Sequence, residues 1–260
     1  MLTTPRLLAL CALVAACEAT VSSDTPVFIE GRAVAPAGDS VFGVTASGGP
    51  LLLLRASGPA DSLGADVLHD PVTAQFAGGQ WWVSDFVNGQ AEVVRFGPAG
   101  PTRVPLGADA AQPHQFAVLP DGGVVYEARD RRLAVRRGDS TALFAVVELG
   151  DRPSLTVGAG GGVLHAVPGR HLTLYNTFGN VRWRIEWPWV ETAHIGALAI
   201  DGRARIHVLS GVADEGTFIV YTIEPGSGEV TRWSVPDSSA TFVVNRLGEV
   251  TAAVGGRWRR

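Results

Sequence analysis

Short apolar runs bounded by turn residues recur along the chain from about residue 26 onwards. Residues 112–147 are the clearest case, with four runs of four to six residues rich in Val, Phe, Leu and Ala. Turn-forming residues such as Asp121, Gly122 and Gly138 separate these runs, which predicts a four-stranded antiparallel meander. No segment shows helical periodicity. Because one meander cannot bury its own faces, it needs similar neighbours in the fold.

The same pattern repeats at a nearly constant spacing. One glycine in the first turn of each unit serves to align the repeats, and these are Gly38, Gly78, Gly122, Gly160, Gly202 and Gly248. The intervals are 40, 44, 38, 42 and 46 residues, so six units fill residues 26–260. Four strands in a unit of this length are typical of a β-propeller. We therefore predict an all-β, six-bladed β-propeller of four-stranded antiparallel blades.

The last unit is too short for four strands. After its second strand only Gly255, Gly256 and residues 257–260 remain, enough for a third strand. Residues 27–30 (VFIE) have no sheet of their own, and we predict that they form the outer strand of the last blade and close the ring. An open sandwich of irregular hairpins is the alternative, but it does not explain the even spacing.

The first residues have the features of an export signal. Arg6 precedes an apolar run of about eleven residues, too short to span a bilayer comfortably. Residues 14–17 (VAAC) resemble a bacterial lipobox, which implies that residues 1–16 are a signal peptide and that Cys17 is lipidated. Residues 17–25 then form a polar tether. This predicts a lipid anchor in the bacterial cell envelope, facing the periplasm or the exterior. An ordinary cleaved signal peptide and a retained anchor are the alternatives.

The repeat resembles the six-bladed propellers of the NHL and TolB type over the whole of residues 26–260. The turns Asp121-Gly122-Gly123 and Asp201-Gly202 carry the resemblance to NHL repeats, and the other units keep only the glycine. The resemblance implies that the loops joining one blade to the next lie at the mouth of a central channel.

Composition excludes several kinds of chemistry. The chain has no lysine, and both cysteines lie within its first 17 residues, so the repeat region offers no Schiff-base lysine and no thiol nucleophile. Sequence motifs of hydrolases, metalloproteases and nucleotide-binding loops are missing, and no catalytic residue is assigned. The net charge of −4 with scattered arginines argues against nucleic acid as a partner.

Three histidines fall in the predicted loops between blades, namely His69, His114 and His194. In propellers such loops surround the channel mouth, where related lyases and lactonases hold a metal, so these imidazoles could share a divalent cation. A polar residue just before a strand is more often a solvated turn or cap, and this interpretation is the preferred one here. No other cofactor is expected. His165, His171 and His207 fall within strands and are interpreted as packing or surface residues.

A tryptophan-rich stretch at residues 183–189 has the most unusual composition of the chain. Alternation along the strand places Trp183 and Ile185 on one face, where they would pack between blades. Trp187 and Trp189 flank Pro188 in the following loop, which predicts either core packing or an exposed anchor for a protein partner. The preferred hypothesis is a membrane-tethered interaction module, an accessory or assembly subunit of an envelope or membrane complex. The alternative is a metal-dependent propeller lyase or lactonase.

The anchor hypothesis predicts that Cys17→Ser releases the protein from the membrane fraction into the soluble fraction. One acyl chain holds a protein to a bilayer only marginally, so stable anchoring requires the several chains that a lipidated cysteine carries. Fractionation and intact mass measure the outcome. Wild-type protein that lacks lipid mass, together with a variant that stays membrane-bound, would contradict the hypothesis.

Overall fold

The structure is a computed structural model of the chain. It describes residues 33–37, 41–45, 48–55, 61–110, 116–130, 132–148, 155–159, 161–167, 170–186, 192–201, 203–212, 218–235, 241–244, 250–254 and 257–259. Within these residues all regular structure is β-strand, and the strands form six small antiparallel sheets. No helix in the described part of the chain is long and apolar enough to cross a membrane.

Each of the first three sheets, called blades 1 to 3, contains four strands that pair in chain order. Their strands are β1 (Ala33–Ala37), β2 (Val41–Thr45), β3 (Leu51–Arg55) and β4 (Asp61–Leu63) in blade 1, β5 (Ala74–Ala77), β6 (Gln80–Val87), β7 (Gln90–Gly97) and β8 (Gly100–Pro105) in blade 2, and β9 (Phe116–Val118), β10 (Val124–Ala128), β11 (Arg132–Arg137) and β12 (Ser140–Val146) in blade 3.

Blades 4 and 5 repeat this arrangement, and blade 6 has three strands among the described residues. Their strands are β13 (Leu155–Ala159), β14 (Gly162–Val167), β15 (His171–Tyr175) and β16 (Val181–Glu186) in blade 4, β17 (Thr192–Ile200), β18 (Ile206–Val212), β19 (Phe218–Ile223) and β20 (Val230–Val235) in blade 5, and β21 (Thr241–Val244), β22 (Val250–Val254) and β23 (Arg257–Arg259) in blade 6.

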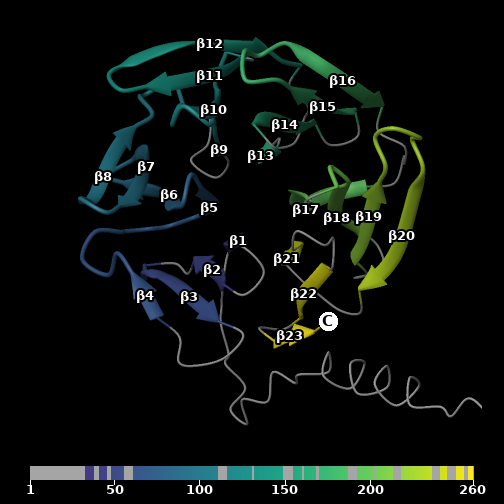
Figure 1. Cartoon of the computed structure of the whole chain (residues 1–260), viewed down its shortest axis with the longest axis horizontal. Coiled ribbons are helices and arrows are strands. Elements are labelled where there is room, and N and C mark those ends of the chain that lie inside the picture. Colours follow the sequence, from purple (N-terminus) through teal and green to yellow (C-terminus); the bar gives the residue numbers. More distant parts are fainter. Residues whose placement is uncertain are drawn as a thin grey trace, which may run out of the picture.

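The blades stand around a common centre (Figure 1). The first strand of each blade lies next to the first strand of the following blade, and β21 of blade 6 lies next to β1 of blade 1. The ring is therefore closed through its inner strands, with the fourth strands of blades 1 to 5 at its periphery. This arrangement confirms the prediction of an all-β propeller with antiparallel blades.

The meander predicted within residues 112–147 is blade 3. Its register pairs Val124 with both Val118 and Arg136, and a bulge in the pairing of β11 with β12 interrupts the outer strand near Phe144. Gly122, with φ of 81°, occupies the turn between the first two strands. Turn residues and apolar runs were sufficient to predict this sheet because its pairings are local.

The hydrophobic core lies between neighbouring blades rather than in one central layer. Four clusters fill the interfaces between blades 1 and 2, 2 and 3, 3 and 4, and 4 and 5. Strand β14 is buried along its whole length because both of its faces meet a neighbouring blade. At about 25 cal/mol per Å² of buried apolar surface, these interfaces are the main stabilising contribution.

The predicted closing strand at residues 27–30 lies outside the described residues. The same holds for residues 1–16, for the lipidated Cys17 and for the tether at residues 17–25. These parts of the sequence interpretation stay predictions.

The turn between β15 and β16 approaches the neighbouring blade closely. Gly179 in this turn has φ of 81°, and a Cβ atom added there would lie 1.9 Å from the carbonyl oxygen of Phe144 on β12. Only a residue without a side chain fits, so the outer edges of blades 3 and 4 are held in direct contact.

Gly179→Ala is expected to destabilise the protein more than Gly122→Ala. Both glycines have φ of 81°, but no atom lies within 4 Å of a Cβ added at Gly122. Left-handed backbone costs alanine about 1–2 kcal/mol in both variants, and the overlap with Phe144 should add about 1–3 kcal/mol in Gly179→Ala alone. Chemical denaturation measures the difference. Equal losses in the two variants would show that blades 3 and 4 do not touch at this point.

Candidate functional site

The loop between blades 1 and 2 is tied to the second strand of blade 2. The carboxylate of Asp85, fully buried on β6, accepts the backbone N–H of His69 at 3.0 Å and that of Asp70 at 2.7 Å. The Nδ1 atom of His69 lies 3.4 Å from the same carboxylate. Because a buried carboxylate needs hydrogen-bond donors, Asp85 and this loop stabilise each other.

Arg103 on the outer strand β8 extends this cluster towards the periphery. Its guanidinium pairs with Glu92 on β7, lies 4.0 Å from Asp85 and donates to the backbone carbonyl of Val67. The acidic groups are thus already paired with a cation and with backbone donors. The cluster has the composition of a structural clamp on the loop.

The loop between blades 2 and 3 is held in a similar way. Its backbone carbonyl at Asp109 accepts the N–H of Arg129, and the Asp109 carboxylate accepts a hydrogen bond from Arg132 at 3.1 Å. The Tyr126 hydroxyl lies 3.5 Å from the same carboxylate. Burial, followed by the charge of Asp109, raises the pKa of Tyr126 above its usual value, so this hydroxyl stays protonated.

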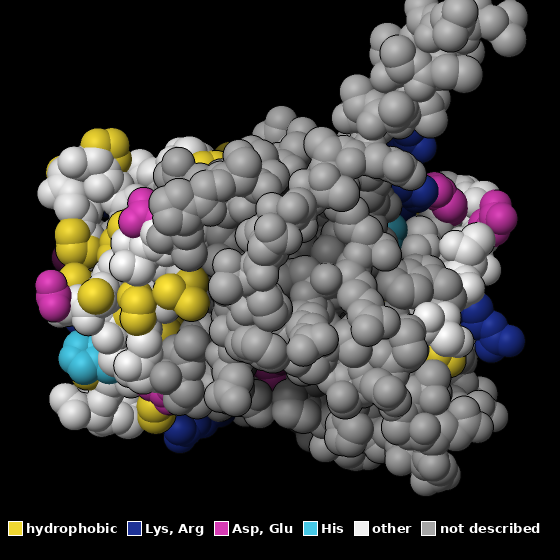
Figure 2. Space-filling model, turned by 90° about the horizontal axis from the view of Figure 1, so that it is seen from below, with side chains coloured by type: hydrophobic (Ala, Val, Ile, Leu, Met, Phe, Trp, Pro, Cys, Tyr) yellow, Lys and Arg dark blue, Asp and Glu magenta, His cyan; other side chains and the backbone are white. Residues whose placement is uncertain are grey.

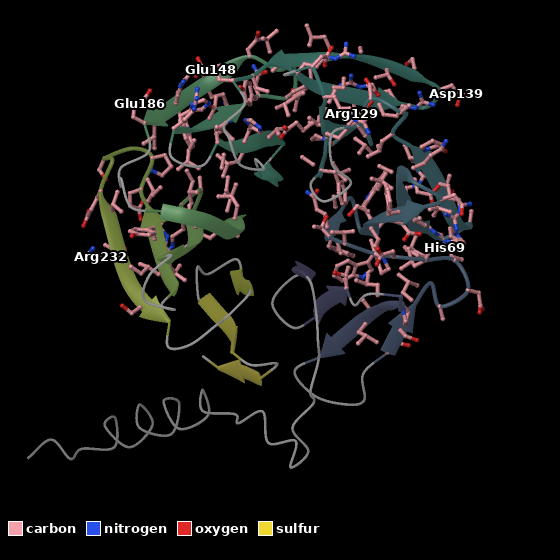
Figure 3. The ribbon with its side chains drawn as sticks, turned by 180° about the vertical axis from the view of Figure 1, so that it is seen from behind. His69, Arg129, Asp139, Glu148, Glu186 and Arg232 are labelled. Atoms are coloured by element: carbon pink, nitrogen blue, oxygen red, sulfur yellow. The ribbon has the colours of Figure 1, made fainter. Side chains whose placement is uncertain are left out.

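Of the three histidines predicted to share a cation, the structure describes the side chain of one. His69 has 56% of its side chain exposed, and Figure 3 shows it on the outer flank of the ring. His194 belongs to β17, with its side chain outside the described residues, and His114 lies wholly outside them. No group of three or more potential metal ligands occurs among the side chains that the structure describes. The shared cation therefore stays a prediction.

His165, His171 and His207 are buried on β14, β15 and β18, in agreement with their interpretation as packing residues. His207 joins Asp201, whose carboxylate lies 3.2 Å from Nε2, to the Thr222 hydroxyl, which lies 3.0 Å from Nδ1. Burial lowers the pKa of His207 despite the opposing effect of Asp201. The neutral imidazole connects three parts of blade 5.

The Asp-Gly turns that carry the resemblance to NHL repeats have a common local structure. Asp121 accepts the N–H of Gly123 at 2.9 Å, and Asp201 accepts that of Arg203 at 2.8 Å, in each case two residues further on. The hydrogen bond from Arg137 lowers the pKa of Asp121 below its usual value. These aspartates stabilise the turns in which they occur.

A polar cluster lies between blades 3 and 4. The Nε2 atom of buried His165 lies 3.7 Å from the Glu127 carboxylate, and neither ring nitrogen of His165 has a hydrogen-bond partner among the residues that the structure describes. Nearer the periphery, Arg184 lies between Glu148 at 3.3 Å and Glu186 at 3.7 Å, the two residues labelled on neighbouring blades in Figure 3. The cluster joins the two blades through charge as well as apolar packing.

Trp187, Pro188 and Trp189, the predicted docking residues, lie outside the described residues. The preceding strand agrees with the prediction, since Trp183 and Ile185 are partly buried and pack against the core cluster between blades 4 and 5. The docking interpretation itself stays a prediction.

The structure shows an exposed apolar patch that the sequence did not single out. The rim patch consists of Leu143 and Val146 on β12 and of Phe178 and Val181 on blade 4, with exposed fractions of 57%, 76%, 83% and 58%. The contact between Gly179 and Phe144 brings these two segments together. β12 and β16 follow one another along the periphery in Figure 1, on the side of the ring opposite to the viewpoint of Figure 2.

A cleft of about 620 Å³ opens between blades 2 and 3, beside the turns that join the first and second strands. Its lining comes from both blades, with Gly161 of blade 4 at its edge. The cleft involves none of the residues predicted to bind a metal or a partner.

Neither a family model nor a curated protein matches the sequence. Solved structures do match the fold. A structural genomics protein of unknown function from Bacteroides thetaiotaomicron VPI-5482 has a TM-score of 0.66 and 11% identity, over 89% of this chain and 68% of that chain. A TolB candidate from Agrobacterium tumefaciens gives 0.64 and 12%, over 88% and 90%, and the WD40 β-propeller domain of Doa1 gives 0.59 and 9%, also over 88% and 90%.

At these identities the comparisons establish the fold alone. The chain has the β-propeller fold, and its likeness to a TolB candidate agrees with the TolB part of the resemblance seen in the sequence. The NHL part of that resemblance and the lipoprotein assignment stay predictions.

The clamp on the first loop predicts that Asp85→Ala destabilises the protein while His69→Ala does not. Loss of the carboxylate leaves the two N–H groups at His69 and Asp70 without their acceptor, which should cost about 1–3 kcal/mol. Removal of the half-exposed imidazole should change the unfolding free energy by less than about 0.5 kcal/mol. Urea denaturation measures both. A larger loss in His69→Ala would contradict this assignment.

The His69→Ala variant also tests the hypothesis that His69 binds a metal ion. A cation bound only by the folded protein must raise the thermal midpoint. If His69 is a ligand, added Zn²⁺ or Mn²⁺ raises the midpoint of the wild type and not that of His69→Ala. Identical responses in the two proteins would exclude His69 from any cation site.

Proposed function

We propose that the protein is a lipid-anchored propeller of the bacterial cell envelope that binds other proteins, as an accessory or assembly subunit of a membrane complex. The rim patch is the observation that carries this proposal. Four of the seven large apolar side chains that are exposed among the described residues belong to the outer strand of blade 3 and to the neighbouring outer segment of blade 4. Exposed apolar side chains concentrated on adjacent outer segments suit an interaction site better than isolated ones do.

The outer strand of blade 3 supports the same proposal. Outer strands of propeller blades are sheet edges, which proteins protect with prolines, charges or short length. β8 is protected by Pro101 and Pro105, and β20 by the charge of Arg232. β16 has a charged residue, arginine or glutamate, at every second position, and β4 is only three residues long. β12, with the sequence STALFAV, has neither a charge nor a proline. The turn at Gly179 touches this strand at the Phe144 carbonyl oxygen, and the rest of its edge, which lacks protective residues, suits a partner that adds a strand beside Leu143.

The tryptophan-rich segment fits this proposal as a second contact. Trp187, Pro188 and Trp189 directly follow β16, the strand on which Val181 of the rim patch lies. Tryptophan is enriched among residues whose truncation costs most binding free energy. A lipid anchor at Cys17 would also raise the local concentration of membrane partners, so that an interface of modest area could suffice.

The proposal predicts that Val146→Ser with Phe178→Ser abolishes recovery of the partner while the propeller remains folded. Both side chains are largely exposed, so their replacement should cost little stability, whereas loss of interface anchors should reduce binding more than about tenfold. Tagged protein is purified from detergent-solubilised membranes, and co-purifying proteins are quantified by mass spectrometry.

Two further variants make the result specific. Phe86→Ser, at a phenylalanine of blade 2 that is 38% exposed, is the matched control and should retain the partner. Trp187→Ala with Trp189→Ala tests the second contact separately. If the rim variant recovers the same proteins in the same amounts as the wild type, blades 3 and 4 do not form the interface. If the Phe86→Ser control loses them as well, the loss does not depend on the rim patch, and the assignment of the interface to blades 3 and 4 fails.

A further inference from the structure

The cleft between blades 2 and 3 has an unusual arrangement of hydrogen-bond donors. Three side chains of one blade face line it: Gln75 on β5, Trp82 on β6 and Arg95 on β7. They are directly opposite one another in the register of the sheet, where Gln75 pairs with Trp82 and Trp82 pairs with Arg95. The residues therefore form a row across blade 2 that faces blade 3.

Arg95 carries a charge that the described residues do not neutralise. Its guanidinium lies over the Trp82 ring, 5.6 Å from the ring centroid, and makes no ion pair or hydrogen bond with any described residue. Its Nε atom is buried and has no hydrogen-bond partner among the described residues. A guanidinium without a carboxylate partner suits an anionic ligand, which would complete the site from the accessible side of the cation.

Trp82 holds the guanidinium in place. The indole Nε1 donates to the backbone carbonyl of Ala77 at 3.2 Å, which fixes the plane of the ring. Stacking on an aromatic face leaves the N–H edge of a guanidinium available for a planar oxyanion. The orientation of Arg95 is thus determined before any ligand binds.

Two glutamine amides add donors beside this cation. The Gln75 Oε1 atom accepts the N–H of Val118 from blade 3 at 3.0 Å, so the amide orientation is determined and its NH₂ group is left for another acceptor. Gln80 packs against Gly97 on the neighbouring strand and makes no hydrogen bond within the described part of the chain. Its amide can also donate to a ligand.

The carboxylate in the lining does not compete for these donors. Asp121 is hydrogen-bonded to Arg137 at 2.7 Å and to the N–H of Gly123 at 2.9 Å, so its charge is already compensated. The rest of the lining is largely apolar, from Phe76, Ala77, Val118, Leu119 and Pro120. A volume of about 620 Å³ lies within the range of small-molecule sites.

We propose that this cleft binds an organic carboxylate with an apolar body. The carboxylate accepts two parallel hydrogen bonds from the guanidinium of Arg95 and further hydrogen bonds from Gln75 and Gln80. The apolar part of the ligand packs on Ala77, Leu119 and Pro120. A free small acid and the carboxyl terminus of a peptide present the same chemistry. This site lies apart from the rim patch, and it does not depend on the proposed function.

Isothermal titration calorimetry with four probes tests the site on the folded protein. The probes are N-acetyl-leucine, its uncharged amide, a short peptide ending in a free leucine carboxylate, and the same peptide with an amidated end. At least one carboxylate should bind, and its amide should bind at least about tenfold more weakly, because the charge-assisted pair is lost. Binding of the small acid identifies a free metabolite as the ligand type, and binding of the peptide alone identifies a chain terminus.

Variants of the donor row decide between this site and binding elsewhere. Arg95→Gln should weaken the carboxylate at least about tenfold, and Arg95→Lys, which keeps the charge but loses the planar fork, should weaken it to an intermediate degree. Arg232→Gln on blade 5 is the matched control and should leave affinity unchanged. Gln80→Ala tests the same cleft without touching the cation, should Arg95→Gln fail to fold.

Three results would overturn the proposal. The first is that neither carboxylate binds at millimolar concentration, and the second is that the amides bind as tightly as the acids. The third is that folded Arg95→Gln, or folded Gln80→Ala if the former does not fold, binds the acid with wild-type affinity.

Discussion

Apolar packing between the faces of adjacent blades is the interaction on which the rest of this structure depends. A four-stranded meander exposes two faces. β14, the second strand of blade 4, is buried on both of its faces because blades 3 and 5 cover them. No blade has a core of its own. Stability therefore depends on the closed circle of inner strands, and the contact of β21 with β1 matters as much as any contact within a blade.

Several polar side chains of the described residues support this packing. Asp85 and Asp109 fasten the loops that carry the chain from one blade to the next, while Asp121 and Asp201 stabilise turns inside a blade. All four carboxylates have backbone N–H groups or arginines as partners, which Asp85 and Asp201 require because they are buried. The partners of these aspartates among the described residues hold loops and turns in place.

The groups left without such partners are the more informative ones. Arg95 in the cleft has a buried Nε atom with no hydrogen-bond partner among the described residues, and the apolar side chains of the rim patch are more than half exposed. They lie in different places, one between blades 2 and 3 and the other on the outer edges of blades 3 and 4. A binding protein can use both, because the rigid ring holds separate surfaces in constant relation to one another.

The sequence by itself determined the strands, the turns and the number of units, because these depend on residues close together in the chain. Apolar runs of strand length and glycines such as Gly122 act locally, and the repeat made their meaning unambiguous. The sequence alone could not distinguish buried from exposed apolar residues in outer strands. Leu143 and Val146 occur in a run that reads like β10, yet β10 is covered on both faces and β12 is an edge. Only the packing of the blades decided which residues far apart in the chain form hydrogen bonds, such as Gln75 with Val118. It also decided the direction of the Arg95 guanidinium.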